Sequence, residues 1–165
     1  AQFPEKRSEK QGEYRYYGST GVIDYIDEFI FEGEFILIGE DGSNLRLRNH
    51  RLSTVVDGRF WVNNHSHILK STRGSNHYFN HQLELSDYTC FITGSTQPKL
   101  TLENLKQVPL VVPPKTEQQE IINYLDEKTQ SIDVMTSIEE KRFKLFNEYR
   151  QSLISEVVTG KKRVV

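Results

Sequence analysis

The chain has 165 residues, of which 36% are hydrophobic and 27% are charged, a composition that excludes a largely disordered protein. No apolar run approaches the roughly 20 residues of a membrane span, the first residues lack the apolar stretch of a signal peptide, and a single cysteine excludes an internal disulfide. The net charge of −2 argues against a uniformly basic DNA-binding protein. Together these features indicate a cytoplasmic protein with no membrane partner.

Residues 1–115 alternate short β-type runs with turns. Strands are expected at residues 22–26, 34–38, 53–56, 60–62 and 67–70. Turn signals separate them, at residues 18–21, 40–44, 57–58 and 73–76. Helical stretches are expected at residues 76–85 and 102–106. The pattern predicts the fold class α+β, with a small domain of irregular topology over residues 1–115.

Charge is unevenly distributed along this domain. Residues 1–42 carry four Lys or Arg against ten Asp or Glu, whereas residues 43–83 carry six against one. All five histidines of the chain also lie in the second stretch. A basic segment is where contacts to nucleic-acid phosphates are expected first, and the alternative is chance clustering on a solvated face.

From Thr116 the sequence changes character, because neither Gly nor Pro occurs again before Gly160. Thr116 and Gln119 have the spacing of a capping box, and two prolines come directly before Lys115. We therefore predict one helix over residues 116–160, roughly 65 Å long, with a basic tail at residues 161–165. A helix of this length exceeds what a domain of this size can bury.

Apolar residues on this helix recur with a spacing near 3.5, which forms a seam along it. The seam consists of Ile121, Leu125, Ile132, Met135, Phe146, Tyr149, Leu153 and Val157. Glu139 and Arg142 interrupt it near its middle. The pattern indicates a coiled coil with a second helix of similar length, and the alternative is a helix packed along its own domain.

The clustered histidines are the first candidates for chemistry. His65 and His67 would share one face of a strand, and His77 and His81 one face of a helix, which would permit a metal site. Neither pair has a cysteine or a clear carboxylate partner nearby in the sequence. Surface polar contacts, including contacts to phosphate or base edges, are therefore the preferred interpretation, and we expect no metal in this chain.

Other motifs give no sign of catalysis. The Gly-Ser-Thr-Gly of residues 18–21 and the Gly-Ser-Thr-Gln of residues 94–97 lack the Gly-Lys-Ser/Thr ending of a P-loop and indicate turns. Glu40 and Asp41, placed before a glycine, indicate turn chemistry, although a catalytic carboxylate pair is the alternative. Cys90 lies in an apolar context and is expected in the core. We expect no catalytic residue and no cofactor in this chain.

Several segments resemble type I restriction–modification specificity subunits. Residues 109–129 are similar to the start of the family's long helical region, and residues 148–160 to its end. Upstream, residues 17–21, 38–42 and 94–100 resemble landmarks of the family's target-recognition domain. The resemblance therefore covers nearly the whole chain.

The resemblance implies a non-catalytic role in recognising double-stranded DNA. Family members carry two target-recognition domains, each followed by a helix, and the two helices pack antiparallel as a spacer. The helices also dock the methyltransferase (modification) subunit, which uses S-adenosylmethionine to methylate adenine. The nuclease–translocase (restriction) subunit joins to form the restricting complex.

The chain departs from the family pattern because it has one such domain and one such helix. It also begins close to residues 17–21, where family members carry a further strand-bearing segment upstream. We therefore expect a half-length or truncated subunit. Its helix would pair antiparallel with a second copy, giving a homodimer that reads a pseudo-palindromic split site, or with a second specificity chain.

Base readout is expected from basic, amide, imidazole and hydroxyl side chains in loops. The candidate DNA-binding residues are Ser19, Thr20, Arg46, Arg48, Asn49, Arg51, Asn63, Asn64, His65, His67, Ser95, Thr96, Gln97 and Lys99. Two alternatives remain open. One is a truncated interaction or regulatory module that binds methyltransferase or specificity subunits without reading DNA, and the other is an independent enzyme that uses the clustered histidines.

Overall fold

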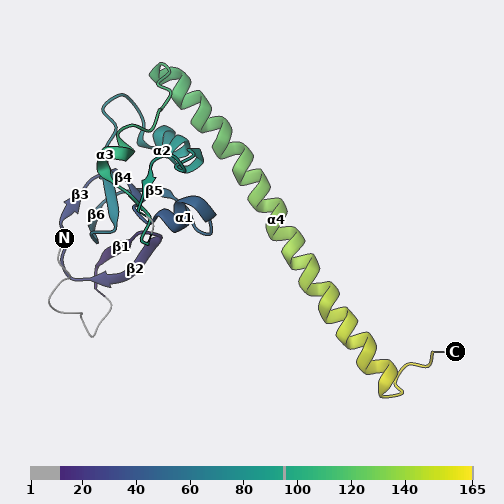
Figure 1. Cartoon of the computed structure of the whole chain (residues 1–165). Coiled ribbons are helices and arrows are strands. Elements are labelled where there is room, and N and C mark those ends of the chain that lie inside the picture. Colours follow the sequence, from purple (N-terminus) through teal and green to yellow (C-terminus); the bar gives the residue numbers. More distant parts are fainter. Residues whose placement is uncertain (1–11, 95, 165) are drawn as a thin grey trace. The chain divides into compact units, whose positions relative to one another are not determined.

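The computed structural model of the chain describes residues 12–94 and 96–164 (Figure 1). The chain forms two compact units that divide between Glu120 and Ile121. The first unit contains three small sheets and three short helices, and the second is the greater part of one long helix. The predicted fold class, α+β, is confirmed.

The largest sheet has four strands in the order β2-β1-β6-β3. β1 (Tyr14–Gly18) pairs antiparallel with β2 (Gly21–Ile26) through a tight turn, with a register irregularity between Tyr16 and Tyr17. β6 (Arg59–Val62) lies parallel to β1 and antiparallel to β3 (Phe31–Glu32). The sheet thus joins strands that are more than forty residues apart, which short-range patterns in the sequence cannot reveal.

The second sheet has the antiparallel order β5-β4-β7. Its central strand is β4 (Phe35–Gly39), flanked by β5 (Ser53–Val56) and β7 (Ser66–Leu69). A third, two-stranded sheet pairs β8 (Ile92–Thr93) with β9 (Lys99–Leu100). The turn at Asp57 and Gly58 therefore does not close a hairpin, because β5 and β6 belong to different sheets.

The hydrophobic core contains inward-facing residues of the two larger sheets. The central cluster consists of Tyr17, Leu37, Val56, Phe60 and Val62. Phe60 is 1% exposed, its ring stacks on that of Phe31 at 5.6 Å, and the edges of neighbouring rings pack around it. Aromatic rings of this size supply much of the apolar area that a small domain can bury.

Three short helices connect these strands. They are α1 (Gly42–Leu47), α2 (Asn76–Leu85) and α3 (Leu102–Leu105). Each begins after a side-chain cap that accepts a hydrogen bond from a backbone N–H of the first turn, and the three caps are Asp41, Ser75 and Thr101. α2 packs on β5 and β4. The segment expected as a turn at residues 40–44 is therefore a helix start, with Asp41 as its cap.

The long helix, α4 (Lys115–Val158), is a single uninterrupted helix of 44 residues (Figure 1). It starts one residue before the position predicted, so Thr116 lies inside the first turn and not at the cap. The first carbonyl to accept an intrahelical hydrogen bond is that of Pro114, from the Gln118 N–H at 3.0 Å. Proline suits this position because it has no N–H to leave unpaired.

Gln118 is 1% exposed and fixes the first turn of α4 within the first unit. Its Oε1 accepts a hydrogen bond from the Ser75 N–H at 3.1 Å, and its Nε2 donates to the carbonyls of Arg73 at 3.2 Å and Pro113 at 3.0 Å. Gly74 has a φ of +154°, and a Cβ there would overlap the Gln118 amide. A buried amide with these bonds satisfied orders the first turn of α4 within the first unit.

The prediction that Cys90 lies in the core is wrong, because Cys90 is exposed. The core position in this segment belongs to Tyr88, whose hydroxyl donates to the Leu83 carbonyl at 2.6 Å. Burial raises the pKa of Tyr88 to about 12. A short turn at residues 88–91 rotates Cys90 outward.

The second unit exposes much of its apolar surface. Phe146 is 63% and Tyr149 65% exposed, and Ile132 and Met135 are similarly open to solvent. Salt bridges on this unit include the pair Arg142 Nη1 and Glu139 Oε1, 2.7 Å apart. In the described part of the chain, no helix is both long and apolar enough to cross a membrane.

Candidate functional site

Two neighbouring pockets of the first unit share Ser19, in the turn between β1 and β2. The carboxylate pocket, of about 310 Å³, is lined by Ser19, Glu40, Asp41, Ser43, His65, Thr96, Gln97, Pro98 and Lys99. The arginine pocket, of about 340 Å³, is lined by Arg15, Tyr17, Gly18, Ser19, Thr20, Gly21, Val22, Leu37, Gly39, Arg51, Leu52, Ser53, Thr54, Val55 and Ser66. A Cβ on Gly39 would come within 2.7 Å of the Ser19 carbonyl oxygen, so glycine lets this turn approach β4.

Backbone hydrogen bonds bring three distant segments together at the carboxylate pocket. The Leu100 N–H donates to the Glu40 carbonyl at 2.9 Å, and the Gly42 N–H donates to the Pro98 carbonyl at 2.9 Å. The Glu40 N–H donates to the His65 carbonyl at 3.0 Å. Segments near residues 40, 65 and 99 therefore form one wall, although they are far apart in the sequence.

Glu40 is the charged centre of this pocket. Its Oε1 accepts hydrogen bonds from Lys99 Nζ at 2.7 Å and from His65 Nδ1 at 3.0 Å. Burial acts to raise the pKa of the Glu40 carboxyl, but the hydrogen bonds and charges of Lys99 and His65 outweigh it, so the pKa lies below its usual value. Glu40 is accordingly ionised at neutral pH and anchors two long, half-exposed side chains.

The anchored groups offer hydrogen bonds at the pocket mouth. The Lys99 ammonium has three donors, and Glu40 takes one of them. When His65 is neutral, the proton that Nδ1 donates to Glu40 leaves Nε2 without a proton, and Nε2 can then accept a hydrogen bond. Hydroxyl and amide groups of Ser43, Thr96 and Gln97 add donors and acceptors. Such a set can read a polar edge of a planar ligand without performing chemistry on it.

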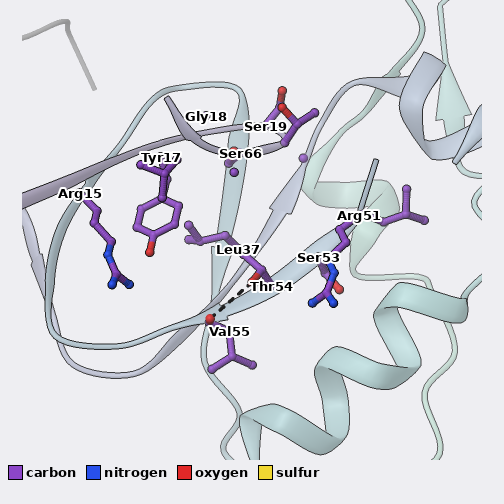
Figure 2. A pocket seen from close by; sticks show the side chains of 15 residues that line it. Arg15, Tyr17, Gly18, Ser19, Leu37, Arg51, Ser53, Thr54, Val55 and Ser66 are labelled. Carbon is purple, nitrogen blue, oxygen red and sulfur yellow. Dashed lines mark hydrogen bonds between the residues drawn. The ribbon is translucent and has the colours of Figure 1, made fainter. Parts of the chain in front are cut away.

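The arginine pocket has a different character (Figure 2). Figure 2 shows the Arg15 and Arg51 guanidinium groups at opposite ends of the pocket, with Leu37, Thr54 and Val55 between them. Hydrogen bonding to the Tyr17 hydroxyl raises the pKa of Arg15. Among the described residues that line this pocket, none carries a carboxylate.

The structure brings together about half of the residues predicted to bind DNA. Five of them line the carboxylate pocket, namely Ser19, His65, Thr96, Gln97 and Lys99. Thr20 and Arg51 line the arginine pocket together with Ser19. Asn63 supports this region, because its Oδ1 accepts a hydrogen bond from the His65 N–H at 3.0 Å.

The other predicted residues line neither pocket. Arg46, Asn49 and Asn64 are exposed. Ser95 lies outside the described residues. A role of these residues in binding DNA stays a prediction.

Arg48 and His67 have structural partners. Arg48 has a left-handed φ of 52°, and its guanidinium donates to the carbonyls of Glu84 and Ser86 at 2.7 Å each, which satisfies the end of α2. His67 Nε2 lies 2.7 Å from the Leu100 carbonyl oxygen. These contacts hold the two residues in the scaffold around the site.

Arg15 and the role of Glu40 were not predicted from the sequence. Arg15 alternates with the buried or half-buried Tyr14 and Tyr16 on β1, and that alternation was the available signal of an outward position. Glu40 was assigned to a turn, and only the tertiary structure places Lys99 beside it.

The histidine pairs do not form a metal site within the described part of the chain, where no three His, Cys, Asp or Glu side chains lie close enough to hold an ion. His65 and His67 contact different partners, as described above. His77 Nε2 lies 3.5 Å from Glu34 Oε2 on the first unit's surface.

Comparison with known proteins gives one consistent family. The family model described as the type I restriction modification DNA specificity domain matches residues 2–141. A putative type I restriction enzyme specificity subunit from Haemophilus influenzae is 38% identical over 119 residues, which are 72% of this chain and 30% of that protein.

Two solved structures share the fold. One, from work on complex assembly and conformational transition of the type I R-M system, has a TM-score of 0.66 at 14% identity and covers 90% of this chain and 38% of its own. The other, the type I restriction–modification S subunit from M. genitalium, has a TM-score of 0.50 at 20% identity, over 88% of this chain and 39% of its own. The chain thus spans between 30% and 39% of the length of these proteins.

Proposed function

The chain belongs to the type I restriction–modification DNA specificity family, and from that membership we propose that it reads one half of a split target in double-stranded DNA. In this proposal the chain is non-catalytic and places the methyltransferase subunit, and the nuclease–translocase subunit, on the target. The observation that carries the proposal is the carboxylate pocket, where five residues predicted from the sequence alone meet.

The pocket suits base readout for chemical reasons. Lys99 and His65 present a donor and an acceptor at positions fixed by Glu40. Amide and hydroxyl side chains beside them match the groups that distinguish base pairs in the major groove. Side chains that are already held in place bind more tightly than mobile ones, because less conformational entropy is lost on binding.

The second part of the proposal is a homodimer through α4. The seam of Ile132, Met135, Phe146 and Tyr149 is exposed, and each of these side chains is large. A patch of this kind on a helix is typical of an interface, since burying each side chain contributes about 1.5–3 kcal/mol. A second copy of the chain suits this surface, because it carries the same apolar seam.

An antiparallel pairing makes the seam self-complementary. If a two-fold axis crosses between residues 140 and 141, Glu139 faces the partner's Arg142, and Arg142 faces the partner's Glu139. The same register places Met135 opposite Phe146 and Ile132 opposite Tyr149, so apolar side chains meet apolar side chains. A parallel pairing would place Glu139 against Glu139 and Arg142 against Arg142, which is unfavourable.

This register has a consequence for the target. The first turns of the two helices would lie roughly 75 Å apart along the pair, at 1.5 Å per residue. Two identical recognition units related by a two-fold axis would read a nearly palindromic site in two separated halves.

A second candidate function is an interaction or regulatory module that binds the methyltransferase subunit or another specificity chain without reading DNA. The observation in its favour is that Glu40 pairs with Lys99 and offsets its positive charge, which weakens attraction to phosphates at this pocket. Binding to another specificity chain would use the same exposed seam on α4.

The test is to co-express the chain with its methyltransferase subunit and to map adenine methylation across the host genome. A split, nearly palindromic methylated motif is expected, and Lys99→Gln should relax or abolish the motif while Lys144→Gln, at an exposed position of α4 outside the seam, leaves it unchanged. An asymmetric motif would indicate pairing with a different specificity chain. An assembled complex without methylation would refute DNA reading and favour the second candidate.

A further inference from the structure

The arginine pocket takes no part in the base readout proposed above. We infer that it holds the sugar–phosphate backbone of one DNA strand, with Arg15 and Arg51 on separate phosphates. The inference rests on the proposed function and adds a second binding site with its own chemistry.

The charge of the pocket points to a polyanion. Two guanidinium groups line it, and among its described lining residues there is no carboxylate to oppose them. The carboxylate pocket, by contrast, contains Glu40, which pairs with both of its nitrogen-bearing side chains. Of the two pockets, the arginine pocket is therefore the one whose own lining residues include no acidic side chain. The nearby Glu84 carboxylate is engaged by the Leu52 and Ser53 N–H groups.

The placement of the two arginines favours a strand over a small anion. They stand at opposite ends of the pocket (Figure 2), an arrangement that suits two successive phosphates of one strand. A nucleic-acid strand carries one charge at every nucleotide. Hydroxyl groups of Ser19, Thr20 and Thr54 lie along the pocket and can donate to phosphate oxygens.

The backbone that carries Arg51 is held in place before any ligand binds. Glu84 Oε2 accepts hydrogen bonds from the Leu52 N–H at 2.9 Å and the Ser53 N–H at 2.8 Å. Asn44 Oδ1 accepts a hydrogen bond from the His50 N–H at 3.0 Å on the other side of Arg51. A loop ordered in this way loses little entropy when it binds.

The two pockets fit a single bound strand because they share Ser19. A backbone that crosses the arginine pocket would bring the edges of its bases to the neighbouring carboxylate pocket. Phosphate contacts would set the register, and the carboxylate pocket would read the sequence.

The experiment measures duplex binding by the full chain as a function of salt concentration. The observed binding constant Kobs falls as salt rises, and the steepness of log Kobs against the logarithm of salt concentration counts the phosphates contacted. Arg15→Gln and Arg51→Gln should each lower this steepness by about 0.9 for each copy of the chain bound to the DNA. The preference for cognate over non-cognate duplex should stay the same, because phosphate contacts carry no sequence information. Arg51→Lys, which keeps the charge, should restore most of the slope.

Arg59→Gln is the matched control, because Arg59 is an exposed arginine of the same unit that pairs with Glu32 at 3.0 Å outside both pockets. Unchanged slopes in Arg15→Gln and Arg51→Gln, with duplex binding intact, would overturn the inference. So would an equal loss of slope in Arg59→Gln.

A second readout separates this inference from the proposed function. Inorganic pyrophosphate, titrated into the full chain, should shift the amide NMR signals of Thr20 and Thr54, and Arg51→Gln should weaken that shift. A shift in a chain that binds no duplex would support the phosphate chemistry while refuting DNA reading. No shift and no duplex binding would overturn both.

Discussion

Two aromatic side chains show how differently the two units are built. Phe60 in the first unit is 1% exposed and is surrounded by other rings, whereas Phe146 on α4 is 63% exposed. The first unit buries its apolar residues between two sheets made of distant segments. The second consists of a helix whose backbone hydrogen bonds join residues close in the sequence. Such a helix can form from its own sequence, and its apolar seam is exposed in the single chain.

The largest effect should come from emptying the core of the first unit. Phe60→Ala should lower its free energy of unfolding by about 3–5 kcal/mol, because the ring leaves a cavity between the sheets. Phe143→Ala on the exposed surface of α4 should change the same quantity by less than about 0.5 kcal/mol. Urea unfolding followed by tryptophan fluorescence measures both, since Trp61 lies in the first unit. Equal losses in the two variants would contradict the comparison.

The junction at the start of α4 gives the next largest effect. Gln118→Ala should destabilise the first unit by about 2 kcal/mol, because the Ser75 N–H and the carbonyls of Arg73 and Pro113 lose their buried partner. Gln130→Ala, at an exposed position of the same helix, is the control. Hydrogen exchange of the Ser75 amide should rise only in Gln118→Ala, and protection in both variants would show that Gln118 has no such role.

The helix seam is tested by charge reversal. Glu139→Arg alone should weaken dimerisation by about tenfold in Kd, since two attractive pairs become repulsive in the antiparallel register. The exchange of both charges, Glu139→Arg with Arg142→Glu, should restore the affinity. A parallel pairing predicts little change in either variant, because like charges face each other before and after. Sedimentation equilibrium distinguishes these outcomes.

The smallest effect concerns pH. The folded-state pKa of Glu40 lies below its usual value near 4.5, so its contribution to stability is fully present above that value and is lost as the pH falls through the lower folded-state pKa. The contribution should be less than about 1 kcal/mol, because Lys99 and His65 are half-exposed. Glu40→Gln should flatten this part of the acid unfolding profile. A profile identical to that of the unsubstituted chain would exclude the role of Glu40.

Local patterns predicted most individual elements. The strands expected at 22–26, 53–56, 60–62 and 67–70 lie within one residue of β2, β5, β6 and β7, and the helix expected at 76–85 coincides with α2. These predictions succeed because the alternation of apolar and polar residues and the helix caps act over a few residues. Failures fall where a single contact decides, as at Cys90, which a turn rotates outward while Tyr88 enters the core.

The candidate site was predicted only in part, for a related reason. Ser19, His65 and Lys99 were singled out from the sequence as candidates for reading bases, and the structure brings these three together at one pocket, while their role in reading bases stays a prediction. Their anchor, Glu40, was assigned to a turn, because its ion pair with Lys99 spans 59 residues of sequence. Arg48 was a candidate for DNA contact, but its guanidinium binds the end of α2.

The long helix, its apolar seam and the α+β character of the first unit follow from the sequence alone, because the hydrophobic period, glycine and proline act locally. Three features follow only from the three-dimensional fold: β5 and β6 enter different sheets, Glu40 holds Lys99 and His65, and Arg15 and Arg51 share a pocket. These features depend on backbone hydrogen bonds and packing between segments tens of residues apart. Such long-range pairings leave no periodic trace in the chain.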